Sequence, residues 1–113
     1  MIGFLAALSA ALAIAAGAFG AHGASSPQAA EWLRTGSIYQ LVHAVAAILL
    51  AQGGLGQVGR MPALLMLIGA AIFAFTLYAM AFGAPRWFGA ITPIGGSLMI
   101  AAWLWAAWGY WRA

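Results

Sequence analysis

The stretch Ile2–Ala21 reads IGFLAALSAALAIAAGAFGA, twenty residues without a charged side chain. A helix needs about 20 mostly apolar residues to cross a hydrocarbon core roughly 30 Å thick. A membrane strand would alternate polar and apolar residues, and Ala6–Ile14 does not alternate. Because backbone groups in lipid must be bonded within the segment, the stretch predicts a membrane-spanning helix. It lacks the basic beginning of a signal peptide, so we expect it to be retained.

Three further apolar windows follow, and together they predict helices over residues 27–53, 61–82 and 91–111. The chain has 113 residues, of which 66% are hydrophobic and only 4% charged, whereas a soluble domain carries roughly a quarter charged residues. This composition excludes a soluble domain, a disordered chain, a disulfide-rich module and a nucleic-acid binder. We therefore expect an all-α integral membrane protein: a single membrane domain over residues 1–113, built as a bundle of four transmembrane helices in contact with the lipid bilayer.

The connections between these helices carry turn and helix-start residues. Ser25–Pro27 combines a serine cap with a proline in the first turn, so the second helix is expected to begin there with a polar, interfacial extension. Gly53–Arg60 is a glycine-rich turn, and Gly83–Arg86 separates the third and fourth helices. The aromatic cluster that begins at Trp103 is typical of the level of the lipid headgroups.

The arginines determine the orientation only weakly. With four spans, both termini share one side with Arg60 and Arg112, while Arg34 and Arg86 lie on the other. The positive-inside rule counts Lys and Arg, and two arginines on each side favour neither orientation strongly. We expect a multi-pass protein with both termini in the cytoplasm, and the even count is also compatible with dual topology.

A narrow polar stripe marks the second helix at membrane depth. Gly36, Tyr39, Gln40 and His43 fall within an arc of about 100° on a helix whose other residues are mostly apolar. Ionisable residues in a membrane are costly and suggest a proton or ligand site. The alternative is hydrogen bonding between helices, for which the expected partners are Thr76, Ser97 and the carbonyls near Pro93.

Two other polar features lie near helix ends. His22 ends the first helix, where a histidine can cap carbonyls and interact with the helix dipole, although it is also a member of the candidate polar site. Glu31 and Arg34 are three residues apart and predict an interfacial ion pair. His22, His43 and Glu31 follow no known metal-binding spacing, so no metal is expected. Without Asp, Cys or a phosphate loop, we expect no catalytic residue, no cofactor and no enzyme activity.

Small residues form ridges on two helices, at Ser9, Ala13, Gly17 and Ala21 and at Ala102, Ala106 and Gly109. Such ridges let helices approach closely, either within the chain or between copies, so a homo-oligomer or a membrane partner protein is possible. Thr92–Gly96 is either an ordinary helix start or a local break in the fourth helix.

Several blocks together carry a family resemblance: GAFGAHG at 17–23, Thr35-Gly36, Tyr39-Gln40 and His43-Ala44 in the second helix, Leu77-Tyr78 in the third, and GAITPIGG at 89–96. The chain resembles the YgdD-like family of small inner-membrane proteins, a domain of unknown function. The resemblance implies four membrane helices in a bacterial inner membrane and brings no activity, substrate or cofactor.

Three functions compete on this basis. The first is a structural or partner-binding protein, which the ridges and the lack of catalytic groups favour. The second is an oligomeric transporter or channel for a small solute or proton, which would use Tyr39, Gln40 and His43. The third is lipid or quinone binding in a groove between helices.

Overall fold

The computed structural model describes residues 1–53 and 55–113, and it confirms the predicted all-α fold. The long helices are α1 (Ile2–His22), α2 (Pro27–Gln52), α3 (Arg60–Ala81) and α4 (Thr92–Arg112). Short 3-10 helices precede the last two of them, η1 (Gly56–Gly59) and η2 (Arg86–Ala90). Within the described residues, four helices are long and apolar enough to cross a membrane.

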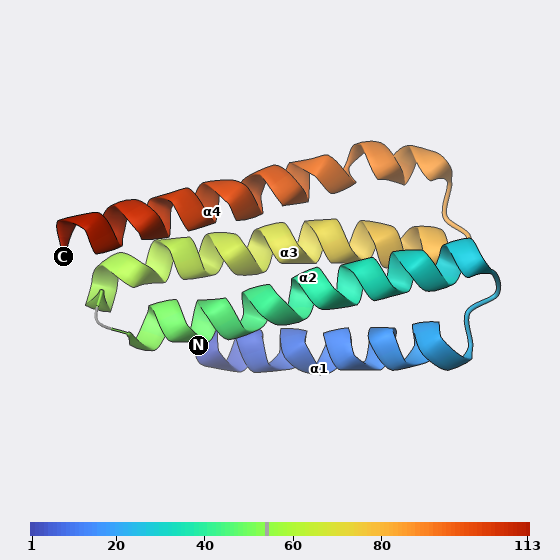
Figure 1. Cartoon of the computed structure of the whole chain (residues 1–113), viewed down its shortest axis with the longest axis horizontal. Coiled ribbons are helices and arrows are strands. Elements are labelled where there is room, and N and C mark those ends of the chain that lie inside the picture. Colours follow the sequence, from blue (N-terminus) through green and yellow to red (C-terminus); the bar gives the residue numbers. More distant parts are fainter. Residues whose placement is uncertain (54) are drawn as a thin grey trace.

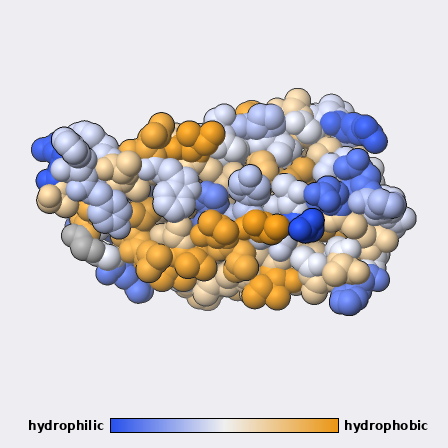
Figure 2. Space-filling view, viewed as in Figure 1, coloured by the Kyte–Doolittle hydropathy of each residue, from blue (hydrophilic) through white to orange (hydrophobic). Residues whose placement is uncertain are grey.

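The helices run antiparallel to their neighbours, with α2 and α3 in the middle and α1 and α4 at opposite edges (Figure 1). Both termini lie at the end that holds η1, and the α1–α2 and α3–α4 connections lie at the other end. The molecule is 47 Å long, which matches a bilayer of roughly 40–45 Å including its headgroup regions. On the face in Figure 2, hydrophilic residues gather toward the two ends and a mostly apolar surface lies between them.

The start of α2 has the predicted cap. The Ser26 hydroxyl accepts a hydrogen bond from the backbone nitrogen of Ala29 at 3.0 Å, and Pro27 occupies the first turn. The first third of α2 exposes Glu31 and Arg34 and buries Leu33 toward the bundle. The polar extension is therefore continuous with the membrane-spanning part of the same helix.

The glycine-rich turn between α2 and α3 is short and mostly helical. Gly54 lies outside the described residues. Gly56 adopts a φ of +59°, in the left-handed region that favours glycine, and η1 then leads directly into α3 at Arg60.

Glycine brings α3 and α4 into backbone contact. α4 begins at Thr92 with Pro93 in its first turn. Of the two predictions for Thr92–Gly96, the ordinary helix start is therefore correct, and the helix has no local break there. A Cβ atom at Gly95 would lie 2.6 Å from the carbonyl oxygen of Gly69 and closer still to the backbone nitrogen of Phe73. Only a residue without a side chain permits this approach.

The small-residue ridges pack within the chain. Ala13 of α1 is fully buried, and its carbonyl accepts a 2.7 Å hydrogen bond from Ser37 of α2. Ser37 also lies directly over Gly17. On α4, Ala102 and Ala106 belong to the core formed with α2 and α3. Both ridges are thus occupied by neighbouring helices, although Ala21, at the end of the first ridge, is exposed.

Candidate functional site

The first polar network joins three helices around Gln40 of α2. The Tyr78 hydroxyl of α3 donates to Gln40 Oε1 at 2.7 Å, and Gln40 Nε2 donates to the Ser9 hydroxyl of α1 at 3.0 Å. Gln40 is 0% exposed. In lipid, hydrogen bonds of this kind hold helices together where the hydrophobic effect provides no attraction between them.

Gly36 makes the room for this network. A Cβ atom at position 36 would lie 2.6 Å from Cε1 of the Tyr78 ring, well inside normal contact. The absence of a side chain therefore lets the ring lie across α2, one turn before Gln40, and reach the amide with its hydroxyl.

The second network joins α2 to α4 through His43. Nδ1 of the imidazole lies 2.7 Å from the carbonyl oxygen of Tyr39, and Nε2 lies 2.9 Å from the indole nitrogen of Trp103. A carbonyl only accepts and an indole N–H only donates, so the proton of a neutral His43 must be on Nδ1. Both ring nitrogens are bonded, and the side chain is 5% exposed.

The polar stripe does not form one site. Gly36, Gln40 and His43 are buried, whereas the Tyr39 side chain is 46% exposed. The Tyr39 ring packs on Phe73 at a centroid distance of 4.8 Å, and its contribution to the His43 network is its backbone carbonyl. Although Tyr39 shares the arc of the other three residues, its side chain is directed to an apolar partner on α3 and not to the interior of the bundle.

The partners expected for the stripe were also wrong. The Thr76 hydroxyl lies 2.7 Å from that of Thr92 and also donates to the carbonyl of Ile72 in its own helix, so it ties α3 to α4 and not to α2. Ser97 is exposed and donates to the carbonyl of Pro93. Neither side chain is bonded to the His43 imidazole.

The remaining candidate residues lie at the end of the bundle away from the termini. His22 is exposed in the last turn of α1. Glu31 and Arg34 line one surface pocket, yet no ion pair within 4.0 Å joins them, since both side chains are exposed and can be hydrated separately. Across residues 1–53 and 55–113, no group of three His, Cys, Asp or Glu side chains is placed to hold a metal ion.

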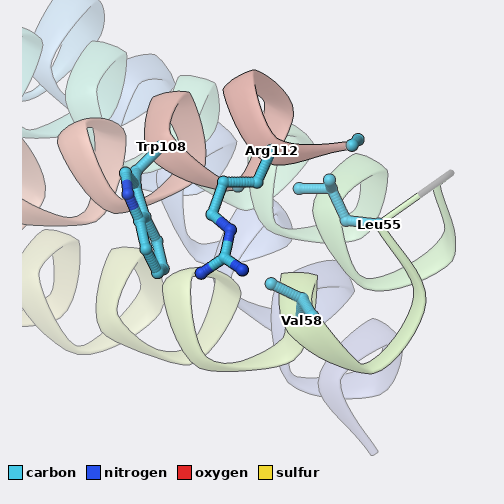
Figure 3. Close-up of a pocket in the computed structure, with 6 residues that line it drawn as sticks. Leu55, Val58, Trp108 and Arg112 are labelled. Atoms are coloured by element: carbon cyan, nitrogen blue, oxygen red, sulfur yellow. The ribbon is translucent and has the colours of Figure 1, made fainter.

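A cavity of about 450 Å³ lies at the terminal end of the bundle, between η1 and the end of α4 (Figure 3). The Arg112 guanidinium lies between the Trp108 ring and Val58, with its central carbon 4.9 Å from the ring centroid. A cation over an indole face at the end of a membrane helix suits the interface, where both groups can contact headgroups.

Three partners in these networks were not predicted from the sequence, namely Ser9, Tyr78 and Trp103. Ser9 was assigned only to a packing ridge. Trp103 belongs to the aromatic cluster that predicts the headgroup level, and it lies nine residues before the end of α4, roughly 14 Å along the helix. The signal that could have found Tyr78 and Trp103 is that each is a polar-tipped aromatic residue within an apolar span, because such tips need a partner.

Similarity to known proteins identifies the family of the chain. A family model described as "Protein of unknown function (DUF423)" matches residues 16–96. The chain belongs to the DUF423 family. No solved structure matches it.

Three relatives illustrate the family. The UPF0382 membrane protein of Haemophilus influenzae is 38% identical, covering 96% of this chain and 92% of the relative. The UPF0382 membrane protein SSP2132 of Staphylococcus saprophyticus is 37% identical, covering 88% of each chain. The UPF0382 inner membrane protein YgdD of Escherichia coli K12 is 32% identical, covering 87% of this chain and 79% of the relative. Membership of the YgdD-like family, predicted from the sequence blocks, is confirmed, and with it a membrane protein of uncharacterised function.

Proposed function

We propose that this chain is a structural or partner-binding protein of the bacterial inner membrane, whose intramembrane polar residues lock its four helices together. The observation that carries the proposal is His43, which has a bonded partner on each ring nitrogen. A histidine that moves protons must present one nitrogen to water or to a substrate. In His43 the Nε2 lone pair is used by Trp103, so the imidazole acts as a fixed link between α2 and α4. The proposal gives the chain no enzymatic role.

The transporter alternative requires the stripe to line one path. Gln40 and His43 instead belong to separate networks, one directed to α1 and α3 and the other to α4. Gln40 lines an open groove in which His43 takes no part. These contacts support bracing over transport.

A flux assay tests this function. The protein would be reconstituted in liposomes with an internal pH dye, and an imposed pH gradient would be followed with the parent chain and with His43→Ala. We expect proton flux equal to that of protein-free liposomes, and a lower unfolding stability for the variant. Flux that is saturable in the parent chain and lost in a His43→Ala protein of unchanged stability would establish the transporter instead.

The proposal includes an orientation with both termini in the cytoplasm. Each end of the bundle carries two arginines, Arg60 and Arg112 at the terminal end and Arg34 and Arg86 at the other, so a fusion experiment must decide the orientation. A carboxyl-terminal green fluorescent protein fusion should fluoresce, and a periplasm-dependent alkaline phosphatase fusion at the same place should be inactive. The opposite pair of results would reverse the orientation, and activity of both would show dual topology.

A further inference from the structure

A surface pocket at the end of the bundle away from the termini holds two opposite charges. The cavity measures about 250 Å³ and lies between the last turns of α1 and the first turns of α2. Glu31 and Arg34 of α2 line it. The rest of its lining consists of small residues and a proline, namely Gly17, Gly20, Ala21, Pro27 and Ala30. The charged groups of this pocket are therefore one carboxylate and one guanidinium.

Neither charge is neutralised by another residue. Among the described residues, no ion pair within 4.0 Å involves Glu31 or Arg34. Glu31 is the only acidic residue of the chain. Arg86, from the other connection at the same end, has its guanidinium carbon 5.9 Å from the centre of the Trp32 ring and does not line the pocket. The carboxylate and the guanidinium are thus both open to a ligand.

The spacing of the two charges favours one short ligand over two separate ones. Side chains three residues apart on a helix have Cβ atoms about 5–6 Å apart, so a small molecule with both charges can contact both. A direct bond between the two side chains would compete little with it, because an exposed ion pair loses hydration and rotamer freedom when it forms. Both side chains are exposed. The pocket is therefore complementary to a zwitterion.

The level of the pocket in the membrane indicates the source of that zwitterion. Glu31 lies four residues into α2, roughly 6 Å from its start, and Gly17 lies five residues before the end of α1, roughly 8 Å. Each headgroup region of a bilayer is roughly 5–8 Å deep. The pocket thus lies at the level of the headgroups and borders the hydrocarbon, where a lipid can place its headgroup in the pocket and its chains beside α1.

We propose that this pocket binds the headgroup of a phospholipid that carries a phosphate and a primary ammonium, as phosphatidylethanolamine does. The phosphate accepts charge-assisted hydrogen bonds from the Arg34 guanidinium, and the ammonium donates to the Glu31 carboxylate. The volume is below the roughly 300 Å³ at which small-molecule sites begin, which suits a headgroup whose chains remain in the bilayer. The site goes beyond the bracing role and does not depend on it, since none of its residues bonds to Gln40 or His43.

Native mass spectrometry of the purified full chain, released from detergent micelles, tests the site. Phosphatidylethanolamine is compared with two lipids of the same acyl chains: phosphatidylcholine, whose methylated ammonium has no hydrogen to donate, and phosphatidylglycerol, which has no ammonium. A further probe, glycerophosphoethanolamine, has the headgroup without the chains. We expect one phosphatidylethanolamine per chain, bound about fivefold more tightly than either other lipid, the upper end for an exposed charge pair. Glycerophosphoethanolamine should bind more weakly still.

Charge substitutions separate the two contacts. Glu31→Gln should lower the affinity for phosphatidylethanolamine about fivefold, to that for phosphatidylglycerol, and should not weaken phosphatidylglycerol binding. Arg34→Gln should weaken the binding of both lipids, because both carry the phosphate. Arg86→Gln is the matched control, since it makes the same change at the same end of the bundle outside the pocket. It should leave the preference for phosphatidylethanolamine unchanged.

A change of shape tests the place of binding. Ala21→Leu fills the pocket and should lower the affinity for phosphatidylethanolamine at least fivefold. Ala15→Leu makes the same change at an exposed position of α1 outside the pocket and should have no effect. The substituted side chains are all exposed, so we expect these variants to fold, and circular dichroism melts identify any that does not.

Three results overturn the inference. Equal binding of phosphatidylethanolamine and phosphatidylglycerol, unaffected by Glu31→Gln, would leave only a contact with the phosphate. Binding of glycerophosphoethanolamine as tight as that of the lipid would assign the pocket to a water-soluble ligand. Absence of saturable binding, or binding unaffected by Ala21→Leu, would remove the headgroup site from this pocket altogether.

Discussion

The contact between α3 and α4 gives the sharpest test of the structure, through a single methyl group. Gly95→Ala would add a Cβ atom 2.6 Å from the carbonyl oxygen of Gly69 and closer still to the backbone nitrogen of Phe73, where ordinary contact begins at 3.4 Å, so the helices must separate by at least about 0.8 Å. The obstructing atoms belong to backbone, so no side chain can rotate away. A gap of roughly 0.5–1 Å loses a quarter to a half of the dispersion energy of each affected contact.

Gly96→Ala is the matched control, because it is the next residue of the same helix. A Cβ atom there would lie 3.8 Å from the Phe73 ring, which is ordinary contact. Both substitutions gain the same helix propensity, up to about 1 kcal/mol, so the gain cancels in their difference. The difference isolates the clash, and overpacking of this kind costs about 1–3 kcal/mol. We expect the upper half of that range.

The assay is reversible unfolding in mixed micelles with increasing sodium dodecyl sulfate, followed by far-ultraviolet circular dichroism. Gly95→Ala should unfold at clearly lower denaturant than Gly96→Ala, with Gly96→Ala at or slightly above the parent chain. If the two variants unfold together, α3 and α4 do not meet in this register, and the placement of Trp103 against His43 would be wrong with it.

The same unfolding assay and one spectrum test three other contacts. Tyr78→Phe leaves Gln40 Oε1 without its donor and should cost about 0.5–2 kcal/mol, whereas a neutral outcome would contradict the hydrogen bond between Tyr78 and Gln40. In a nitrogen-15 spectrum of the imidazole, His43 should show a protonated Nδ1 and an unprotonated Nε2; the reverse pattern would contradict the Trp103 bond. Ser26→Ala removes the cap of α2 and should cost about 1 kcal/mol, with exposed Ser25→Ala as the unaffected control.

The sequence was sufficient for the elements of the fold. Membrane spans are set by local length and apolarity, and the segment Ile2–Ala21 has both without reference to any neighbour. The start of α2 was equally local, since Ser26 and Pro27 act within their own turn. Features that depend on a single segment, such as the membrane spans and the cap of α2, could therefore be predicted from the sequence.

The candidate site depends on contacts that no single segment determines. Gln40 and His43 are three residues apart, and the helix period alone predicts that they share a face. Which helix lies against each of them is a property of the assembled bundle. His43 meets Trp103, sixty residues away in the chain, and not Thr76, because α4 packs along α3 far enough to present its indole to α2. The partners of a polar residue thus follow from the order of the helices, which hydropathy does not encode.

The polar networks can determine the order in which the four helices pack in the bundle. Apolar faces in lipid are nearly interchangeable, because hydrocarbon solvates leucine as well as another helix does. Small ridges allow close approach but do not specify a partner, and α1 and α4 both carry one. Gln40 pairs with a hydroxyl of α1, whereas His43 needs a donor that α4 supplies through Trp103. An exchange of the two edge helices would leave a donor or an acceptor unpaired on each side of α2. The costly polar residues at membrane depth therefore select one arrangement of four otherwise similar helices.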